Sequence, residues 1–411
     1  MKEMKNLTLG ISGLLLLAIQ VNAKQVALPT PPAVPESSVM ISRSTSKVNK
    51  SRTVSTTVNN WSSDQDQDQS DDPMKTKTFS KSFSIDKNDK VSLSNQYGSI
   101  TIKTWDKKEV KLDADIKVYA NTDSEAQKLI DDVSISSSKS DDGVVFKTNM
   151  GDMNGNWGRG NKNGKKWRRE IKVSLTLYMP STNALTVAQS FGNVNMENFA
   201  GPTSLKVEYG NLTTGVLSNV NNYVSVQFGK AEIEEVNQAT IKHEYGSGLT
   251  LGSANTLKLS AQFTGVKIGT IKNSADIKHE YGAGLTIEKV GSLILKANFI
   301  KVKILALAGN GTINAEYGGG VTIDQVEAGC KKLDINAHFA GINLGFSLNL
   351  NADLDISTQF GGFKSTADGV EVKRTDENKG FTQSKAYTGK VGKGGTSKIN
   401  VKTEYGSVSL K

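Results

Sequence analysis

From Phe79 onwards, apolar and polar residues alternate along much of the chain. Residues 91–97 read Val-Ser-Leu-Ser-Asn-Gln-Tyr, and the same two-residue period returns at residues 100–102. A period of two is that of a β-strand with one buried and one exposed face. The pattern therefore predicts an all-β fold.

One segment has helical spacing instead. Thr122 and Glu125 have the spacing of a capping box, which marks the start of a helix. The apolar residues that follow recur every three or four positions and would form a buried stripe: Ala126, Leu129, Ile130 and Val133. We predict one short helix at residues 122–133, within an N-terminal β-rich part that spans residues 78–190. Residues 149–169 are rich in Gly and Asn and predict a long, basic loop.

An internal repeat begins near Ser190. Each unit contains an aromatic residue that usually follows Glu, Gln, Asn or His and often precedes Gly. The spacing is 17 to 19 residues as far as Tyr317, and then 22 and 21. The aromatic residues are Phe191, Tyr209, Phe228, Tyr245, Phe263, Tyr281, Phe299, Tyr317, Phe339 and Phe360.

A unit this short can bury its apolar side only by stacking on copies of itself. We therefore predict a right-handed parallel β-helix, a β-solenoid with roughly 18 to 22 residues per unit, over residues 191–411. Helix 122–133 is expected to cap one end, and the tail from Lys379 to close the other. In one representative unit, the residues expected to point inward are Leu293, Leu295, Ala297, Phe299, Val302 and Ile304.

The length of one turn has two interpretations, because Tyr and Phe alternate along the repeat. A turn of about 36 residues would place the two aromatic residues on opposite faces. His243 and His279, two units apart, would then be neighbours, whereas units of 18 residues would separate them by about 10 Å. The next equivalent position is Ala315, so no third ligand recurs. We expect both histidines to line the wall of the solenoid, and we predict no metal and no cofactor.

The N-terminus has the features of a secretory signal peptide. Lys2 and Lys5 precede an apolar run of about 13 residues, and residues 21–23 form a small-residue cleavage site. A helix needs roughly 20 apolar residues to cross a bilayer, so we expect cleavage after residue 23 and no transmembrane segment afterwards. Residues 24–77 are rich in Pro, Ser, Thr and Asp and predict a disordered linker. The expected location is the periplasm or the cell surface.

The amino-acid composition limits the classes of binding partner. The chain has 50 basic and 41 acidic residues and a single cysteine, Cys330, which excludes an intramolecular disulfide. This modest positive charge suits an anionic glycan, an envelope polymer or an envelope protein, and does not indicate nucleic-acid binding. The candidate ligand-binding residues combine basic and aromatic side chains: Trp157, Arg159, Lys165, Lys166, Trp167, Arg168 and Arg169. The alternative is a solvated hairpin tip whose charge only maintains solubility.

Four segments carry a resemblance to a known family. They are residues 95–105, the strand ending at residues 178–180, the Phe-Gly-Asn-Val at residues 191–194, and residues 398–411. Over residues 79–411 the chain resembles the bacterial putative-adhesin domain of unknown function, related to the head-GIN putative auto-transporter adhesins. The resemblance implies a right-handed parallel β-helix in an exported envelope protein, and it supplies no functional residue.

The acidic residues do not form a catalytic cluster in the sequence. They recur beside the tyrosines, once in every second unit, at Glu208, Glu244, Glu280 and Glu316. Polysaccharide-cleaving β-helices need a localised set of carboxylates or a calcium site. We therefore expect a non-enzymatic exported binding protein or adhesin that uses the solenoid surface. One alternative is a periplasmic structural or envelope-stress signalling component. The other is a polysaccharide-active enzyme, which the spread of the carboxylates disfavours.

Overall fold

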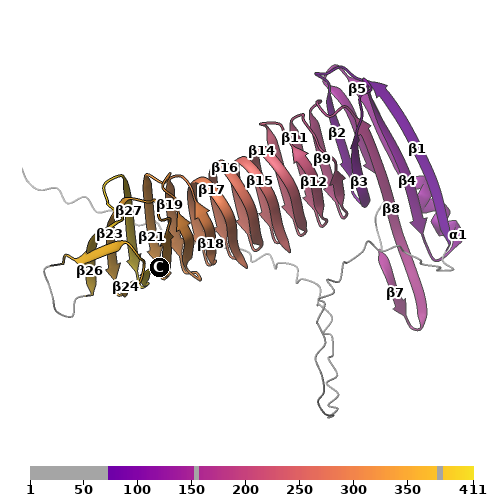
Figure 1. Ribbon diagram of the computed structural model, residues 1–411. Coiled ribbons are helices and arrows are strands. Elements are labelled where there is room, and N and C mark those ends of the chain that lie inside the picture. Colours follow the sequence, from indigo (N-terminus) through magenta and orange to yellow (C-terminus); the bar gives the residue numbers. More distant parts are fainter. Residues whose placement is uncertain (1–72, 152–156, 377–382) are drawn as a thin grey trace, which may run out of the picture. The chain divides into compact units, whose positions relative to one another are not determined.

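The computed structural model describes residues 73–151, 157–376 and 383–411 (Figure 1). The predicted signal peptide and all but the last five residues of the predicted linker lie outside these residues. The described residues form an all-β fold whose 28 strands belong to one extended sheet, with a single helix. The first strand, β1 (Met74–Ser84), begins inside the stretch assigned to the linker.

Two parallel ladders of strands make up the repetitive part (Figure 1). The first ladder contains the strands that precede each aromatic residue: β9 (Leu185–Ser190), β11 (Thr203–Glu208), β13 (Asn222–Gln227), the second halves of β14 (Lys230–Glu244), β15 (Gly248–Gln262), β16 (Gly265–Glu280) and β17 (Gly284–Asn298), then β19 (Gly311–Glu316) and β21 (Lys332–His338). The second ladder contains the strands that follow it: β10 (Val194–Met196), β12 (Leu212–Leu217), the first halves of β14 to β17, β18 (Val302–Leu307), β20 (Val321–Val326) and β22 (Ile342–Phe346).

Each repeat unit pairs with the next one along the chain. Leu205 lies beside Val224, for example, and Leu285 lies beside Val302. The chain thus passes from one ladder to the other and back within each unit. This register excludes the alternative period of about 36 residues.

The core lies between the ladders and consists of alternate residues of each strand. Five of the six residues predicted to point inward around Phe299 are buried, each no more than 2% exposed: Leu293, Leu295, Ala297, Val302 and Ile304. The prediction for Phe299 is wrong, because its side chain is 48% exposed. Its backbone has φ +56°, in the left-handed region. This conformation turns the chain at a corner between the ladders and breaks the two-residue alternation, so Ile300 is buried instead.

The N-terminal part continues both ladders. On one side β3 (Gly98–Thr104) lies between β10 and β8 (Lys165–Met179) and is parallel to both. Strand β4 (Glu109–Tyr119) pairs antiparallel with β8, and β1 pairs antiparallel with β4. On the other side β2 (Lys90–Asn95) joins β9 to β6 (Gly143–Asn149), which pairs with β5 (Ser134–Ser140). The predicted helix is confirmed as α1 (Asp123–Asp132), where the Glu125 N–H donates to Oγ1 of Thr122 at 3.2 Å. The helix packs against β1 and β4.

The predicted long loop at residues 149–169 is wrong for the residues that the structure describes. Strand β7 (Gly158–Lys162) pairs with the start of β8 as an antiparallel hairpin. Asn163 and Gly164 form its turn with φ values of +53° and +76°. Asn-Gly is the favoured dipeptide of a two-residue hairpin, and this signal was outweighed by the Gly- and Asn-rich composition around it. Residues 152–156 lie outside the described part.

The C-terminal end contains a skipped layer. Strand β23 (Ala352–Gln359) follows β22 directly in the chain, yet it does not pair with β21. Strand β27 (Ser397–Glu404) lies between β21 and β23 in parallel to both, and β28 (Val408–Leu410) lies likewise between β22 and β24 (Phe363–Ser365). Of the closing tail predicted from Lys379, only β26 (Ser384–Val391) covers an edge, where it pairs antiparallel with β23. Strand β25 (Val370–Arg374), which precedes the tail, pairs antiparallel with β26. The last strands instead fill the layer that the chain skipped.

Candidate functional site

A column of stacked rings, here named the aromatic ladder, runs along one corner of the repeat. Neighbouring ring centroids are 4.6 to 5.3 Å apart. From Phe191 onwards the side chains are 42% to 51% exposed. In stacking order the rings are Tyr97, Phe191, Tyr209, Phe228, Tyr245, Phe263, Tyr281, Phe299, Tyr317, Phe339, Tyr405 and Phe360. Tyr405 enters from the inserted C-terminal strand, and the alternation of Tyr and Phe is therefore unbroken.

The backbone of the aromatic ladder is strained. The rings from Phe191 onwards belong to residues with φ between +48° and +56°, where a side chain costs about 1 to 2 kcal/mol per residue. Each stacked pair returns about 0.5 to 1.5 kcal/mol beyond its burial. Stacking therefore offsets the strain, and it leaves the ring edges at the surface.

Substitution of Phe263 separates the energy of ring stacking from the cost of the left-handed backbone. Phe263→Ala removes the stack and keeps the strain, whereas Phe263→Gly removes both. We expect Phe263→Ala to lower the free energy of unfolding more than Phe263→Gly does, by about 1 kcal/mol. Urea unfolding of the two variants measures the difference. A less stable Gly variant would show that the left-handed conformation costs nothing at this corner.

The residues that precede the rings form a second exposed column. Within the aromatic ladder, Glu precedes each tyrosine from Tyr209 onwards, and a neutral polar residue precedes each phenylalanine as far as Phe299. The carboxylate of Glu280 accepts hydrogen bonds from Nε2 of Gln262 at 2.9 Å and Nδ2 of Asn298 at 3.3 Å. Because like charges on adjacent strands repel, neutral layers between the acids stabilise the stack. This explains why acidic and neutral residues alternate with a period of two units, although the backbone repeats with every unit.

Glu280 of this column is held in the ionised form. Partial burial tends to raise the pKa of Glu280, but hydrogen bonds from Lys278, Gln262 and Asn298 outweigh it, and the pKa lies below its usual value. A carboxyl group with a lowered pKa is a poor proton donor at neutral pH. The carboxylate therefore serves to order the column.

The two repeat histidines lie in the core, where each is 0% exposed. Ala261 separates His243 from His279 in the register of the first ladder. Nε2 of His279 lies 3.0 Å from the carbonyl oxygen of Thr264. Burial lowers the pKa of both rings, that of His243 to about 4, although the backbone of Gly229 acts in the opposite direction there. Within the described part of the chain, no three His, Cys, Asp or Glu side chains are grouped to hold a metal ion.

These lowered pKa values predict acid sensitivity. Between about pH 6.5 and pH 4 the unfolded chain binds a proton at His243 that the folded chain does not, so the free energy of unfolding falls as the pH falls. The full effect is about 3 kcal/mol for a pKa of about 4. His243→Val, which matches the neighbouring Val226, is expected to flatten this pH dependence. Chemical denaturation at pH 7 and pH 5 measures it, and an unchanged slope in the variant would contradict the assignment.

The seven candidate residues from the sequence lie on the β7–β8 hairpin and just before it. Arg168 is only 3% exposed and is fully engaged. Its guanidinium lies 3.6 Å from the ring centroid of Tyr119, Nη2 is 2.8 Å from Glu170, and its N–H donates to Asn121. Arg168 thus fixes the hairpin to the sheet and is not available to a ligand.

The other candidates divide into two groups. Lys165, Lys166, Trp167 and Arg169 line one cavity of about 660 Å³, together with Asn121, Glu125 and Asn163. The Arg169 guanidinium lies 4.4 Å from the ring centroid of Trp157, which packs against the core. Arg159 is opposite Arg168 across the hairpin and does not line this cavity.

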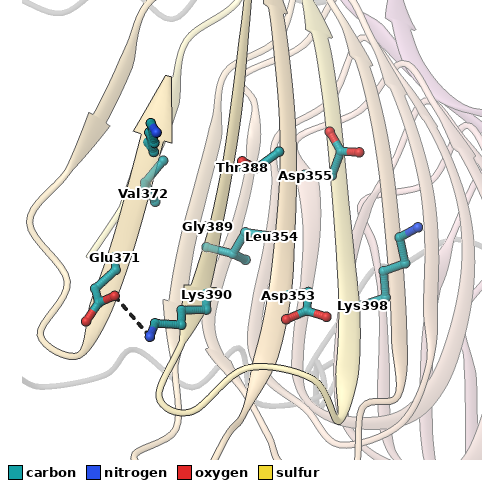
Figure 2. A pocket seen from close by; sticks show the side chains of 10 residues that line it. Asp353, Leu354, Asp355, Glu371, Val372, Thr388, Gly389, Lys390 and Lys398 are labelled. Atoms are coloured by element: carbon teal, nitrogen blue, oxygen red, sulfur yellow. Dashed lines mark ion pairs between the residues drawn. The ribbon is translucent and has the colours of Figure 1, made fainter. Parts of the chain in front are cut away.

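A further groove, also of about 660 Å³, lies between β23, β25 and β26 (Figure 2). Its charges are mixed: Asp353 lies opposite Lys398 on the adjacent strand, and Glu371 pairs with Lys390 at 3.1 Å. Oδ1 of Asp353 accepts from the Gly395 N–H at 2.8 Å. The local pairing of these charges favours a structural role.

One groove on the second ladder has a clear excess of positive charge, and the sequence reasoning missed it. Its volume is about 500 Å³, and its charged lining consists of Lys230, Lys267, Lys301 and Lys303. A signal was present, because each of these lysines follows a phenylalanine of the repeat within two to four residues. We name this feature the basic groove.

The single cysteine of the chain is not in a reactive state. The thiol of Cys330 is buried, and burial raises its pKa to about 11, so it is protonated at neutral pH. No helix of the described residues is long and apolar enough to cross a membrane.

Comparison with known proteins gives structural neighbours only. No family model and no curated protein matches the chain. It is similar to a putative adhesin from Bacteroides fragilis, with 10% identity, TM-score 0.24, and coverage of 82% of this chain and 97% of that chain. A putative cell adhesion protein from Clostridium sporogenes has 11% identity, TM-score 0.16, and coverages of 82% and 99%. A putative adhesin from Parabacteroides distasonis has 12% identity, TM-score 0.25, and coverages of 82% and 97%. These TM-scores are too low to establish a shared fold.

Proposed function

We propose that this protein is an exported, non-catalytic binding module of the cell envelope, an adhesin-like protein that recognises its partner through the surface of a β-solenoid. The observation that carries the proposal is the aromatic ladder. Twelve rings form one continuous, half-exposed apolar strip beside polar columns. Monomeric proteins rarely expose a continuous apolar strip unless it contacts a partner.

The strand register supports the solenoid. Both ladders are parallel, and each unit crosses between them at the ring corner and returns before the next unit begins. We infer a right-handed parallel β-helix, since connections between parallel strands of one sheet are right-handed in nearly all proteins. A solenoid gives a long, regular surface whose binding groups repeat at a fixed interval.

The hairpin cavity is a second candidate surface. Lys165, Lys166 and Arg169 supply positive charge around Trp167, and this combination suits an anionic sugar or headgroup. The ligand set is smaller than the sequence prediction, because Arg168 is committed to Glu170 and Tyr119, and Trp157 and Arg159 do not line the cavity.

Binding to envelope material tests the role of the aromatic ladder. The triple variant Tyr245→Asn, Phe263→Asn and Tyr281→Asn removes three adjacent rings, and Asn tolerates the left-handed backbone. We expect the purified protein to cosediment with isolated envelopes and the triple variant to lose most of this binding. A matched control, Tyr223→Asn, removes a ring outside the ladder. Equal binding by all three proteins would overturn the proposal.

The cellular location of the protein distinguishes an adhesin from the alternative, a periplasmic structural or envelope-stress signalling component. The test is protease digestion of intact cells and of osmotically opened cells, with an antibody to the repeat and a periplasmic control protein. Digestion on intact cells supports an adhesin. Protection until the cells are opened contradicts an adhesin and favours the periplasmic component.

A further inference from the structure

The basic groove lies on the second ladder, directly after the corner occupied by the rings from Phe228 to Phe299. Four lysines line it, together with the hydroxyls of Thr250 and Thr286, and none of its lining residues is acidic. Lys267 and Lys301 have no ion pair with any described residue, whereas Lys230 pairs with Glu232 and Lys303 lies 3.5 Å from Asp324. Two of the four positive charges are therefore free to attract an anion.

Several residues that line the basic groove have small side chains or none. Gly248, Gly265 and Gly284 lie at the start of successive strands, with Ser247 and Ala283 beside them. An extended ligand can therefore approach the backbone closely. The neighbouring ring edges lie at the same corner, because Gly265 and Gly284 follow Phe263 and Tyr281 by two and three residues.

Two lysines of the basic groove lie two strands apart in one register column. Lys267, Thr286 and Lys303 occupy one register position on three successive strands. With strands about 4.8 Å apart, positive charges along this column are about 10 Å apart. The tyrosine hydroxyls of the aromatic ladder have the same double spacing, since Tyr245 and Tyr281 are separated by Phe263.

We propose that the basic groove binds an acidic polysaccharide that carries one negative charge per disaccharide. In a β-linked glycan of alternating sugars, every second sugar has the same face and substituent, and this two-sugar repeat is similar in length to two strand spacings. Each carboxylate can then meet a lysine, while the intervening sugar faces a threonine hydroxyl. A polymer charged on every sugar places half of its charges opposite threonine, and the charges of a polyphosphate are spaced more closely than the strands.

This inference rests on the proposed binding function and specifies its ligand class. Lys acts as a hydrated point charge, so the interaction is expected to weaken as salt rises. Nucleic acid is a poorer fit, because its charges are spaced more closely than the lysines.

The test measures binding of fluorescent oligosaccharides to the purified protein by anisotropy, at low and physiological salt. The probes are hyaluronan, with one carboxylate per disaccharide, polygalacturonate, with one per sugar, neutral chitin oligosaccharide, and polyphosphate. We expect hyaluronan to bind most tightly and to weaken with salt. The double variant Lys267→Gln and Lys303→Gln is expected to weaken its binding roughly tenfold, equivalent to about 1.4 kcal/mol.

The matched control, Lys258→Gln and Lys296→Gln, removes two exposed lysines from the first ladder and is expected to leave binding unchanged. Equal losses in both double variants, or tighter binding of polygalacturonate, polyphosphate or the neutral glycan, would overturn the inference. Envelope binding that depends on the aromatic ladder but occurs without hyaluronan binding rejects this ligand class alone. Loss of the ladder dependence rejects the proposed function itself.

Discussion

A chain that ends before Ser397 is expected to lose the folded state of its C-terminal part. Strands β27 and β28 fill the skipped layer, and their removal leaves the facing edges of four strands unpaired. It also removes four apolar side chains that are each no more than 1% exposed: Ile399, Val401, Val408 and Leu410. Their burial contributes on the order of 6 to 12 kcal/mol, which equals the whole stability of many domains.

Limited proteolysis and urea unfolding of the truncated and complete chains measure this effect. A pair of point variants tests the same layer without truncation. Val401→Asp buries an unpaired charge and is expected to cost about 4 kcal/mol or more. Lys402→Ser is expected to be close to neutral, because Lys402 points outward beside Ser357. Truncation without loss of protection at β21 to β24 would show that these strands pair without the inserted layer.

Gly282→Ala is expected to destabilise the fold by about 2 to 3 kcal/mol. A Cβ atom at Gly282 would lie 1.9 Å from the carbonyl oxygen of Thr264, which belongs to the adjacent unit. It would also lie 2.9 Å from Nε2 of His279 and disturb the contact between that ring and Thr264. Neither neighbour is the free end of a flexible chain, so the backbone itself has to move.

Gly265→Ala is the matched control, because a Cβ atom there meets only Ala283, at 3.4 Å. We expect this variant to unfold at nearly the same urea concentration as the natural chain. Thermal and urea unfolding of both variants give the comparison. Similar stabilities for the two would show that the units separate easily at this corner.

Local patterns were sufficient for the elements whose causes are local. The two-residue period marks the strands, and the Thr122 cap with its apolar stripe marks the helix. Phe299 was misplaced because a strand pattern contains no information about the left-handed residue that ends it. The alternation of buried and exposed residues does not continue across the corner.

The skipped layer was beyond prediction for a different reason. Strand β27 resembles the repeat units in sequence, with Glu404 before Tyr405, but its position between β21 and β23 depends on pairing over more than 60 residues. The alternation rule is the signal that could have found it. Phe339 and Phe360 follow each other in the chain without an intervening tyrosine, and Tyr405 is the ring that restores the order.

For the candidate surfaces, composition identified the basic hairpin but not the state of its side chains. Arg168 and Arg169 are neighbours in sequence and have opposite faces in strand β8, so one is buried against Tyr119 and the other lines the cavity. The basic groove combines four lysines from three units, each unremarkable alone. Only the strand register brings them to one surface.

The skipped layer also determines when the molecule is complete. A protein is synthesised from its N-terminus, so β23 and β24 exist before the strands that separate them from β21 and β22. Until β27 and β28 are synthesised, the facing edges of β21 and β23, and of β22 and β24, expose backbone groups that would template pairing with other chains. Strands β27 and β28 therefore complete the fold of this region. We expect chains that end before Ser397 to be degraded or to aggregate, while chains that contain both strands persist.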